Sequence, residues 1–286
     1  MVINFCDVQT RIQATGLVLA LLTTALCTHA HAETKLAANY TISFARIRVG
    51  DITASLVLGD ADYAMSANGR AGGVMKALMD GEGSFKSRGT MAEGQPIPTN
   101  FNSKIVSKAE TAAVTVILDE GSVKDYAVVP VLGPGRLPMT EANRQGVIDP
   151  LTAMLFPATA GGDGLSSEAC RLTRPIFDGH QRYDLKLAFK SMDKVAAEKG
   201  YTGPVVVCSL HYEPIDGHNP SNSLVKYLSD GREIEVALAP IRGTRLLAPF
   251  RLSVMSILGN VLIEANQFEA TELPFGAATV ADPKSQ

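Results

Sequence analysis

The feature that most constrains the fold is an alternation of apolar and polar residues that returns along most of the chain. Near the N-terminal end it runs through residues 40–44, 52–58 and 63–67. A repeat of two residues with one apolar face is typical of half-buried strands in an antiparallel sheet. The pairs Gly50-Asp51 and Gly59-Asp60 separate these runs, and we expect a turn at each pair. This part of the chain therefore predicts an antiparallel meander.

The alternation continues through the rest of the chain. Near the C-terminal end, residues 224–228 and 232–238 flank Asp230-Gly231, a dipeptide that favours a tight hairpin turn. We expect about 14 strands, without the regular strand–helix alternation of parallel α/β folds. The fold class is therefore all-β and mainly antiparallel: a strongly curved meander sheet, a barrel or half-barrel, with two or three short helices. The remaining candidate strands are residues 83–89, 98–106, 112–118, 123–131, 183–189, 205–212, 244–254 and 260–268.

Three short segments interrupt the alternation and predict helices. Residues 72–80 carry apolar side chains at helical spacing, including two methionines, which is typical of a lid across one face of a sheet. Asp149 precedes Pro150, as an N-cap residue precedes proline at the first position of a helix. The third helix is expected at residues 191–199. Residues 130–146 are rich in proline and glycine and predict a long loop.

The N-terminal residues 1–32 have the features of a secretory signal peptide. Arg11 supplies a positive charge, residues 16–27 are apolar, and an Ala-His-Ala motif ends at Ala32. The apolar stretch of about 12 residues is shorter than the roughly 20 that a membrane-spanning helix needs. We therefore expect cleavage after Ala32 and export to the periplasm, with release into the medium as the alternative. The mature chain is predicted to hold one β-rich domain at residues 33–270 and a flexible tail at 271–286.

Cleavage would remove Cys6 and Cys27 and leave Cys170 and Cys208 as the cysteines of the mature chain. An even number of cysteines in an oxidising compartment favours a disulfide bond. The bond would close a loop of 38 residues, and chain entropy gives it a stabilising contribution of about 4 kcal/mol at most. Redox-active pairs usually lie within a Cys-x-x-Cys motif. The wide spacing here therefore predicts a structural bond.

Composition and motifs exclude several classes of function. A formal net charge of −3 is too small to argue for binding to nucleic acid or to an anionic membrane surface. The chain has no tryptophan and only 6% aromatic residues, so it offers few aromatic platforms for sugars or bases. Phosphate loops, dinucleotide-binding fingerprints and the Gly-x-Ser-x-Gly motif of hydrolases are absent from the sequence. We expect no cofactor.

Histidines and aspartates in the region 178–218 raise the alternative of an enzyme. A metal-dependent or acid–base hydrolytic enzyme would use His180 and His211 together with nearby aspartates. Zinc sites draw ligands from short, regular spacings, whereas His211 and His218 are separated by Pro214 and an expected turn. We therefore assign no catalytic and no metal-binding residue. The aspartates in this region are Asp178, Asp184 and Asp216.

The favoured hypothesis places function on the sheet itself. The inner face of a half-barrel that is lined by Leu, Ile, Phe, Met and Tyr is suited to a lipid tail or to an apolar segment of an envelope protein partner. The same side chains would otherwise fill a closed core. We therefore expect a periplasmic protein without enzymatic activity, which maintains the cell envelope by binding an apolar ligand or a protein partner.

Several segments, in their order along the chain, resemble the alphaproteobacterial branch of the bacterial domain-of-unknown-function 3108 family. The resemblance covers roughly residues 40–270. It implies an exported, antiparallel β protein of the cell envelope, and it implies no catalytic residues. The segments that carry it are Tyr40-Thr-Ile-Ser-Phe, Gly50-Asp-Ile-Thr-Ala, Ser87-Arg-Gly-Thr, Pro98-Thr-Asn-Phe, Asp149-Pro-Leu-Thr-Ala, Cys170, Phe177-Asp-Gly-His-Gln-Arg-Tyr-Asp-Leu, Tyr201-Thr-Gly-Pro-Val-Val-Val-Cys, Leu238-Ala-Pro-Ile and Pro249-Phe-Arg-Leu.

Overall fold

The computed structural model describes residues 33–73, 81–158, 164–231, 233–256 and 259–273. The expected signal peptide, nearly all of the expected lid and most of the expected tail lie outside these residues. All strands of the described residues belong to one 15-stranded sheet. No helix in the described part of the chain is long and apolar enough to cross a membrane. The expected all-β, mainly antiparallel fold with a curved sheet is confirmed.

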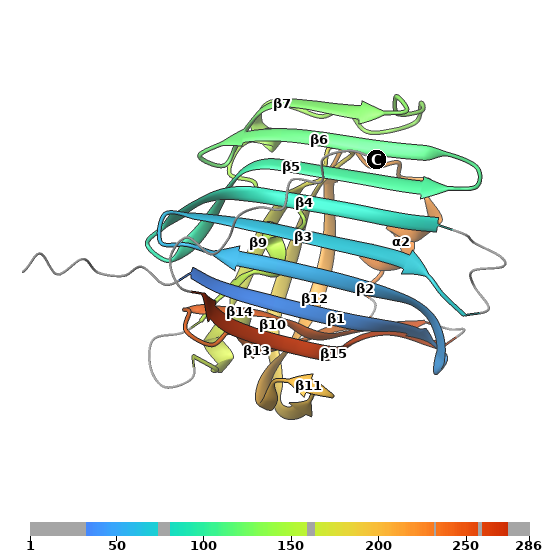
Figure 1. Cartoon of the computed structure of the whole chain (residues 1–286). Helices are drawn as coiled ribbons and strands as arrows, with labels where there is room; N and C mark the ends of the chain where they lie inside the picture. Colours follow the sequence, from blue (N-terminus) through green and yellow to red (C-terminus); the bar gives the residue numbers. More distant parts are fainter. Residues whose placement is uncertain (1–32, 74–80, 159–163, 232, 257–258, 274–286) are drawn as a thin grey trace, which may run out of the picture. The chain divides into compact units, whose positions relative to one another are not determined.

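The first seven strands form an antiparallel meander in which each strand pairs with the next (Figure 1). We call this meander the front layer. Its first turn lies at Ala45 and Arg46, which both have a positive φ, so the turn expected at Gly50-Asp51 is wrong. The pair expected at Gly59-Asp60 does form a turn. The strands are β1 (Glu33–Phe44), β2 (Ile47–Leu58), β3 (Asp62–Ala71), β4 (Gly81–Ala92), β5 (Gln95–Ser107), β6 (Thr111–Asp119) and β7 (Ser122–Val129).

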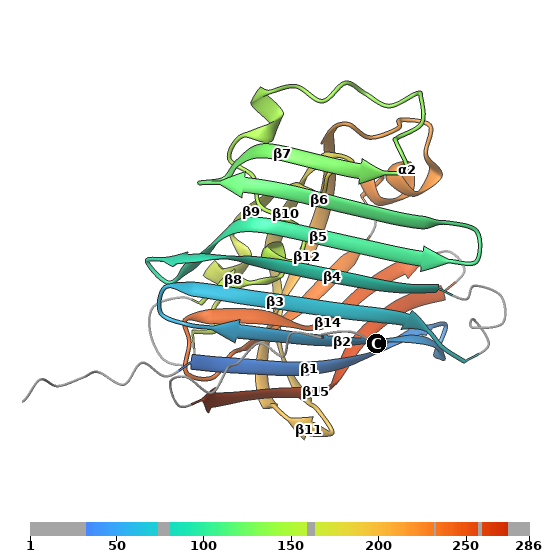
Figure 2. The ribbon, with the colours of Figure 1, turned by 45° about the horizontal axis from the view of Figure 1, so that its top comes forward.

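The last strand, β15 (Gly259–Leu273), pairs with β1 and connects the front layer to the remaining strands. We call these strands the rear layer. From β15 outward they are β14 (Leu246–Ser256), β13 (Ile234–Pro240), β12 (Thr202–Asp216), β10 (Arg182–Ala196) and β9 (Leu172–Phe177). Strands β12 and β10 run steeply behind the front layer in both views of the ribbon (Figures 1 and 2). Two short strands, β8 (Phe156–Pro157) and β11 (Lys199–Gly200), pair with β14 and β15.

A connecting segment bridges the two outermost strands of the sheet. The backbone N–H of Val147 donates to the carbonyl of Gly121, in the turn between β6 and β7. One residue later, Ile148 exchanges backbone hydrogen bonds with the β9 residues Pro175 and Phe177. The segment that begins here then runs along the inner side of the front layer. Its position decides how much of that side stays open.

The rear layer packs against one face of the front layer and buries part of it. We call this face of the front layer the inner face. The strand register places its members opposite one another on neighbouring strands. Strand β12 is buried on both sides: Val205 and Val207 join the core beneath the front layer, whereas Val206 and Cys208 join a second core with Phe156. Inner-face residues that are fully or almost fully buried are Leu36, Leu56, Tyr63, Ser87, Phe101 and Val116.

Among the described residues the structure has one α-helix and three short 3₁₀ helices. The helix expected at 191–199 is wrong, because β10 continues to Ala196 and turns back into β12. The strand expected at 224–228 is also wrong: Asn222 caps α2 (Ser223–Ser229) by accepting the N–H groups of Leu224 and Val225. The helix expected after Asp149 is shortened to a 3₁₀ turn, η2 (Thr152–Met154). The other two 3₁₀ helices are η1 (Ala142–Arg144) and η3 (Ser167–Cys170).

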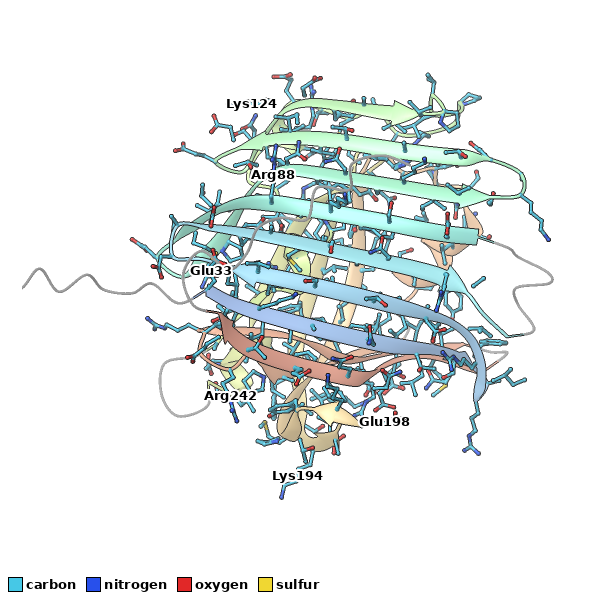
Figure 3. The ribbon with its side chains drawn as sticks, in the orientation of Figure 1. Glu33, Arg88, Lys124, Lys194, Glu198 and Arg242 are labelled. Carbon is cyan, nitrogen blue, oxygen red and sulfur yellow. A yellow bond between two sulfur atoms is a disulfide. The ribbon has the colours of Figure 1, made fainter. Side chains whose placement is uncertain are left out.

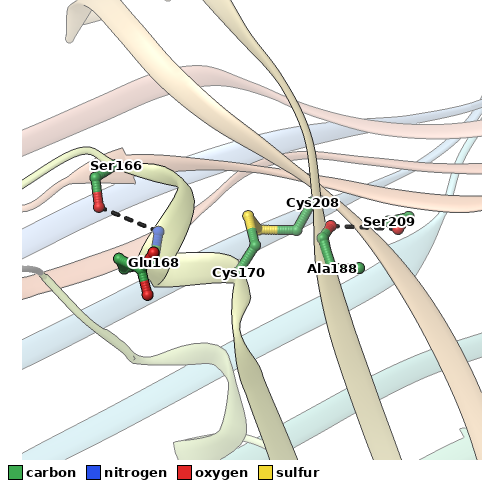
Figure 4. The surroundings of a disulfide bond; sticks show 6 residues. All are labelled: Ser166, Glu168, Cys170, Ala188, Cys208 and Ser209. Carbon is green, nitrogen blue, oxygen red and sulfur yellow. Dashed lines mark hydrogen bonds between the residues drawn. A yellow bond between two sulfur atoms is a disulfide. The ribbon is translucent and has the colours of Figure 1, made fainter.

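A disulfide bond joins Cys170, at the end of η3, to Cys208 in the middle of β12 (Figure 4). The two Cα atoms lie 5.4 Å apart, and both cysteines are fully inaccessible to solvent. The N-terminus of η3 is held by Ser166, whose hydroxyl accepts the N–H of Glu168. The bond therefore holds η3 against β12, in the second core, and not against the inner face of the front layer.

Candidate functional site

An apolar groove lies on the inner face of the front layer, at the strand ends next to the β1–β2 turn. Its volume is about 440 Å³, within the range of about 300–1,000 Å³ that is typical of small-molecule sites. Arg70 and Glu82 also border it, although the register places their side chains on the outer face. The apolar side chains that line the groove are Ile42, Val49, Ile52, Ala67, Ala71, Phe85 and Ile105.

The groove exists because glycines occupy its floor. Ile52 lies opposite Gly69, Gly69 opposite Gly83, and Gly83 opposite Ile105, so these four residues form one row across β2, β3, β4 and β5. Residues that face one another on neighbouring strands point to the same side of the sheet. Because strands are spaced by about 4.8 Å, the two isoleucines stand about 14 Å apart with bare backbone between them. The side chain of Phe85 borders the same trough.

The groove is open to solvent. Ile105 is 49% exposed, and Ile42, Ile52 and Phe85 are half-buried. Ile42 and Ile52 have the same orientation as Leu36 and Leu56, which are buried at the other end of the same two strands. The inner face is therefore filled at one end and accessible at the other.

The outer face of the same strands carries a second hollow of about 500 Å³, which differs in chemistry. Gly69 and Gly83 contribute to both hollows, because a glycine leaves backbone exposed on either side of the sheet. The outer hollow is lined mainly by polar and charged residues. These are Asp51, Thr53, Asn68, Arg70, Glu82, Ser84 and Lys104. Of these two hollows in the described part of the chain, the inner one is therefore the one suited to an apolar ligand.

A buried polar cluster closes the filled end of the inner face. Asp149 is fully buried, and its Oδ1 accepts the N–H groups of Leu151 and Thr152. Its Oδ2 accepts the hydroxyl groups of Ser87 and Thr152. The hydroxyl group of Tyr63 completes the cluster, 2.6 Å from the hydroxyl of Thr152. The cluster thus fixes η2 against β3 and β4 and prevents the groove from extending to this end.

Arg174 holds the same segment from the β9 side. Its Nη2 donates to the carbonyl groups of Thr152 and Leu155, and its guanidinium lies 5.6 Å from the ring centroid of Phe156. Burial lowers the pKa of Arg174 to about 10, although the negative charge of Asp149 opposes this shift. The guanidinium keeps its positive charge at neutral pH, because the lowered pKa still lies well above 7.

Burial has the opposite effect on the acids of the cluster. It raises the pKa of Asp149, and the hydrogen bonds from Thr152, Ser87 and Leu151 partly offset the shift. Burial also raises the pKa of Tyr63, with a further contribution from the charge of Asp149. Because every hydrogen-bonding group of Asp149 is already engaged within the chain, this carboxyl group has a structural role as a cap and latch.

The structure does not bring the residues of the alternative enzyme hypothesis together. His211 is exposed and lies opposite Lys186 on β10, whereas His180 belongs to the turn before that strand. Asp178 accepts the N–H groups of His180 and Gln181, so it closes its own turn. Within the described residues, no three His, Cys, Asp or Glu side chains form a group that could hold a metal ion.

The other two aspartates of that region also have partners within the chain. Asp184 forms an ion pair with Arg182 at 2.7 Å. Asp216 accepts the N–H of Thr140 and the side-chain amide of Asn143, and so anchors the long loop after β7. His218 is buried, and its backbone carbonyl accepts the N–H of Leu137, which belongs to that loop. These contacts join parts of the same chain and are therefore structural.

A family model described as "Protein of unknown function (DUF3108)" matches residues 39–265. That segment is most of the sequence and includes the groove, the polar cluster and the disulfide bond. The chain belongs to the DUF3108 family. No curated protein matches this DUF3108 protein.

A solved structure with a similar arrangement is described as a beta-barrel-like protein of domain of unknown function DUF1849 from Brucella abortus. The sequence identity is 10%, and the match covers 84% of this DUF3108 chain and 98% of the Brucella chain. The TM-score is 0.42.

Sequence reasoning missed the glycine floor of the groove. Gly69 and Gly83 lie in segments with otherwise alternating residues, where isolated glycines indicate a bulge or a close approach of backbone. Their pairing depends on the register of β3 with β4, which the sequence does not display. A signal was present in Gly50, Gly69 and Gly83, since each interrupts the apolar positions of a different strand. The expected lid at 72–80, apart from Gly72 and Gly73, lies outside the described residues.

Proposed function

We propose that this DUF3108 protein is a non-enzymatic binding protein of the cell envelope, and that it holds an apolar chain in the groove. The observation that supports the proposal most directly is the position of Ile42, Ile52 and Phe85. These side chains lie on the face that elsewhere forms the core, and yet they remain partly exposed. A ligand that covered them would remove carbon surface from water, and this removal is the main favourable contribution to binding of an apolar molecule.

The dimensions of the groove favour a slender ligand, such as a lipid acyl chain. The trough between Ile52 and Ile105 is about 14 Å wide between backbones, and side chains on both sides narrow it. Each methylene group that leaves water contributes about 0.8 kcal/mol, so eight buried methylenes contribute about 6 kcal/mol. The glycine floor provides no hydrogen-bonding side chain to a bound molecule. Recognition of such a ligand would therefore rest on shape and carbon contact.

The proposed place of action is the periplasm. The sequence features of an exported protein and the disulfide bond between Cys170 and Cys208 support this proposal. A bond of this kind persists in an oxidising compartment and is rare in the cytosol. An exported carrier that accepts acyl chains would contribute to the maintenance of the envelope. An apolar segment of an envelope protein is the alternative occupant.

Binding of a stearic acid that carries an anthroyloxy fluorophore tests the proposal. The Gly69→Val variant fills the groove from its floor, and the position has room, because an added Cβ would meet only the Ile52 side chain at 3.7 Å and the Asp51 carbonyl at 3.8 Å. If valine excludes about two methylenes, the affinity falls by about 1.6 kcal/mol, or roughly tenfold. Ser66→Val is the matched control, since Ser66 lies on the same strand and on its outer face.

We expect saturable binding at one site per chain, a roughly tenfold weaker Kd for Gly69→Val, and an unchanged Kd for Ser66→Val. Both variants should keep the stability of the wild type or exceed it, because valine suits a strand better than glycine or serine does. Equal affinity of the two variants for the fatty acid would show that the ligand does not occupy the groove. Failure of the wild type to bind would reject the acyl chain as the ligand.

A further inference from the structure

Large apolar side chains are exposed around the open end of the groove. Ile47 is 57% exposed and begins β2, directly after the β1–β2 turn. Ile105 is 49% exposed near the end of β5, and Val129 is 60% exposed at the end of β7. Val131, two residues further on, is 89% exposed. Met255 is 51% exposed beside the last pairs of β14 with β15.

The strand register places Ile47, Ile105, Val129 and Met255 at one end of the sheet, and Val131 follows the end of β7 by two residues. Ile47 pairs with Phe44, which pairs with Val261 near the start of β15. Ile105 and Val129 belong to the pairs that lie closest to the β5–β6 connection and the end of β7. In Figure 1 this is the right-hand end, where the arrowheads of β3, β5 and β7 point. We call the exposed apolar residues Ile47, Ile105, Val129, Val131 and Met255 the rim.

Helix α2 adds to the same end of the sheet. The hydroxyl group of Tyr227 donates to the carbonyl of Met255 at 2.7 Å, so the helix lies beside the rim. Its residue Leu224 is 61% exposed. The described part of the chain has nine exposed large apolar residues. Six of them lie at this end: the five rim residues and Leu224. Single exposed apolar side chains are ordinary, whereas a concentration around one opening marks an interaction surface.

Basic side chains accompany the rim. Arg46 and Arg48 flank Ile47 in sequence, and Lys104 precedes Ile105; all three are exposed. Lys108 is exposed in the turn that follows β5. Acidic groups also lie at this end: Asp51 is paired with Arg48, Glu82 and Glu110 are exposed, and Asp230 and Glu233 are exposed beside α2. Basic side chains therefore stand directly beside the apolar side chains Ile47 and Ile105, although the end as a whole carries both signs of charge.

We propose that the rim docks on the surface of a lipid bilayer, and this inference rests on the proposed function of the groove. Side chains such as Ile47 and Val131 would enter the boundary between headgroups and acyl chains, while Arg46 and Lys104 would face lipid phosphates. In this orientation the open end of the groove faces the bilayer. An acyl chain passes between the bilayer and the groove without crossing water.

The distribution of the rim residues favours a bilayer over a protein partner. They come from separate strand ends and turns, and polar or charged residues separate them in sequence. A specific protein interface has a continuous, closely packed apolar centre with charged residues at its periphery. A bilayer accepts separate protruding side chains, because lipids rearrange around each of them. Basic residues beside the apolar ones add attraction to anionic headgroups.

Flotation of the full-length mature protein with lipid vesicles tests this inference. The vesicles contain phosphatidylcholine alone or phosphatidylcholine with phosphatidylglycerol. The rim variant carries Ile47→Asp and Val131→Asp, and the matched control carries Phe189→Asp and Met192→Asp. The control residues are 44% and 49% exposed, on β10, and Figure 3 shows the nearby Lys194 at the lower edge, far from the right-hand end.

We expect the wild type and the control to float with vesicles, more strongly when phosphatidylglycerol is present, and the rim variant to bind at least tenfold more weakly. Equal flotation of the rim variant and the wild type would overturn the inference. Absence of the wild type from all vesicle fractions would also overturn the inference, even if a protein partner were found to bind the rim. A urea unfolding midpoint equal to that of the wild type verifies that the rim variant is folded.

Binding of the soluble anthroyloxy fatty acid, measured without vesicles, separates the two proposals. The rim variant should retain this binding, because neither substitution lies on the groove floor. Vesicle binding without fatty-acid binding in the wild type would reject the function proposed for the groove and leave the docking surface in place. Fatty-acid binding without vesicle binding would reject the docking surface alone.

Discussion

Replacement of Asp149 by alanine tests whether the buried polar cluster holds the segment between β7 and β9 against the front layer. In the wild type, Oδ1 of Asp149 accepts the N–H groups of both Leu151 and Thr152. The hydroxyl groups of Ser87 and Thr152 also bond to one another, so they keep a partner when the carboxyl group is removed. The change therefore leaves two backbone donors without an acceptor.

The magnitude follows from those two donors. An unsatisfied buried polar group costs about 1–3 kcal/mol, so two cost about 2–6 kcal/mol. Removal of a buried carboxyl group recovers part of this cost, because burial disfavours its charged form. We expect Asp149→Ala to lower the free energy of unfolding by about 3 kcal/mol. Asp149→Asn retains an acceptor at Oδ1 and should cost less than alanine does.

Urea unfolding at several pH values gives the free energies. Burial raises the pKa of Asp149 in the folded state above its unfolded value of about 3.9. The folded state therefore binds this proton more tightly, and the resulting stabilisation is fully present below pH of about 3.9 and is lost as the pH rises through the folded pKa. The Asp149→Asn side chain does not titrate. The advantage of the wild type over Asp149→Asn should thus shrink as the pH rises above about 4 and passes through the raised pKa of Asp149.

Two results would refute this reasoning. If Asp149→Ala lowered the free energy of unfolding by less than about 1 kcal/mol, the two N–H groups would have found other acceptors. Asp149 would then not be what holds the segment between β7 and β9 against the front layer. An advantage of the wild type over Asp149→Asn that grows with pH would mean that the hydrogen bonds outweigh burial. In that case the folded state would favour the ionised carboxylate.

Further predictions concern the disulfide bond and Arg174. The Cys170→Ser/Cys208→Ser variant should unfold at a lower urea concentration, because its free energy of unfolding falls by about 4 kcal/mol when the 38-residue loop is no longer closed. An unchanged midpoint, with or without reductant, would contradict a structural role of the bond. Arg174→Met keeps the apolar stem but removes two hydrogen bonds to buried carbonyl groups, so it should lower the free energy of unfolding by about 2 kcal/mol. Arg171→Met, at an exposed position with a surface ion pair, should change it by less than about 0.5 kcal/mol; equal losses for the two variants would argue against the role of Arg174.

The sequence predicted the fold class because alternation of apolar and polar residues reflects directly which face of a strand is buried. It failed at positions where tertiary contacts override a local signal. Gly50 looks like a turn residue, but its place is inside β2, where an added Cβ would approach the carbonyl oxygen of Arg70 to 2.7 Å. The actual turn uses Ala45 and Arg46 with positive φ, a conformation that these residues adopt rarely and that no local signal indicates.

Helices and strands were exchanged in two places, for different reasons. Residues 191–199 contain good helix formers, yet β10 extends through them because β12 pairs with this segment as far as Ala196. Residues 224–228 alternate like a strand, and Asp230-Gly231 resembles a hairpin turn. The N-cap residue Asn222 and the glycine after the helix were the signals that favoured a helix instead.

The candidate site was predicted only in outline. The expectation of an apolar inner face followed from alternation, but the groove depends on the pairing of Gly69 with Gly83. A shift of one residue in register would place these glycines on the outer face, so their role cannot be read from one strand alone. The pairing of β1 with β15 joins residues more than 200 positions apart, for example Asn39 and Gln267. No local pattern indicates such a contact.

The central claim, that an apolar chain occupies the groove, is tested most directly by native mass spectrometry of the protein extracted from periplasm without detergent. The claim predicts a mass that corresponds to residues 33–286 with one bound lipid, and loss of the lipid mass at moderate collision energy. Gly69→Val, extracted in the same way, should appear mainly as the bare chain, whereas Ser66→Val should retain the lipid. Wild-type protein that carries no lipid, or a lipid that remains bound to Gly69→Val, would contradict the claim.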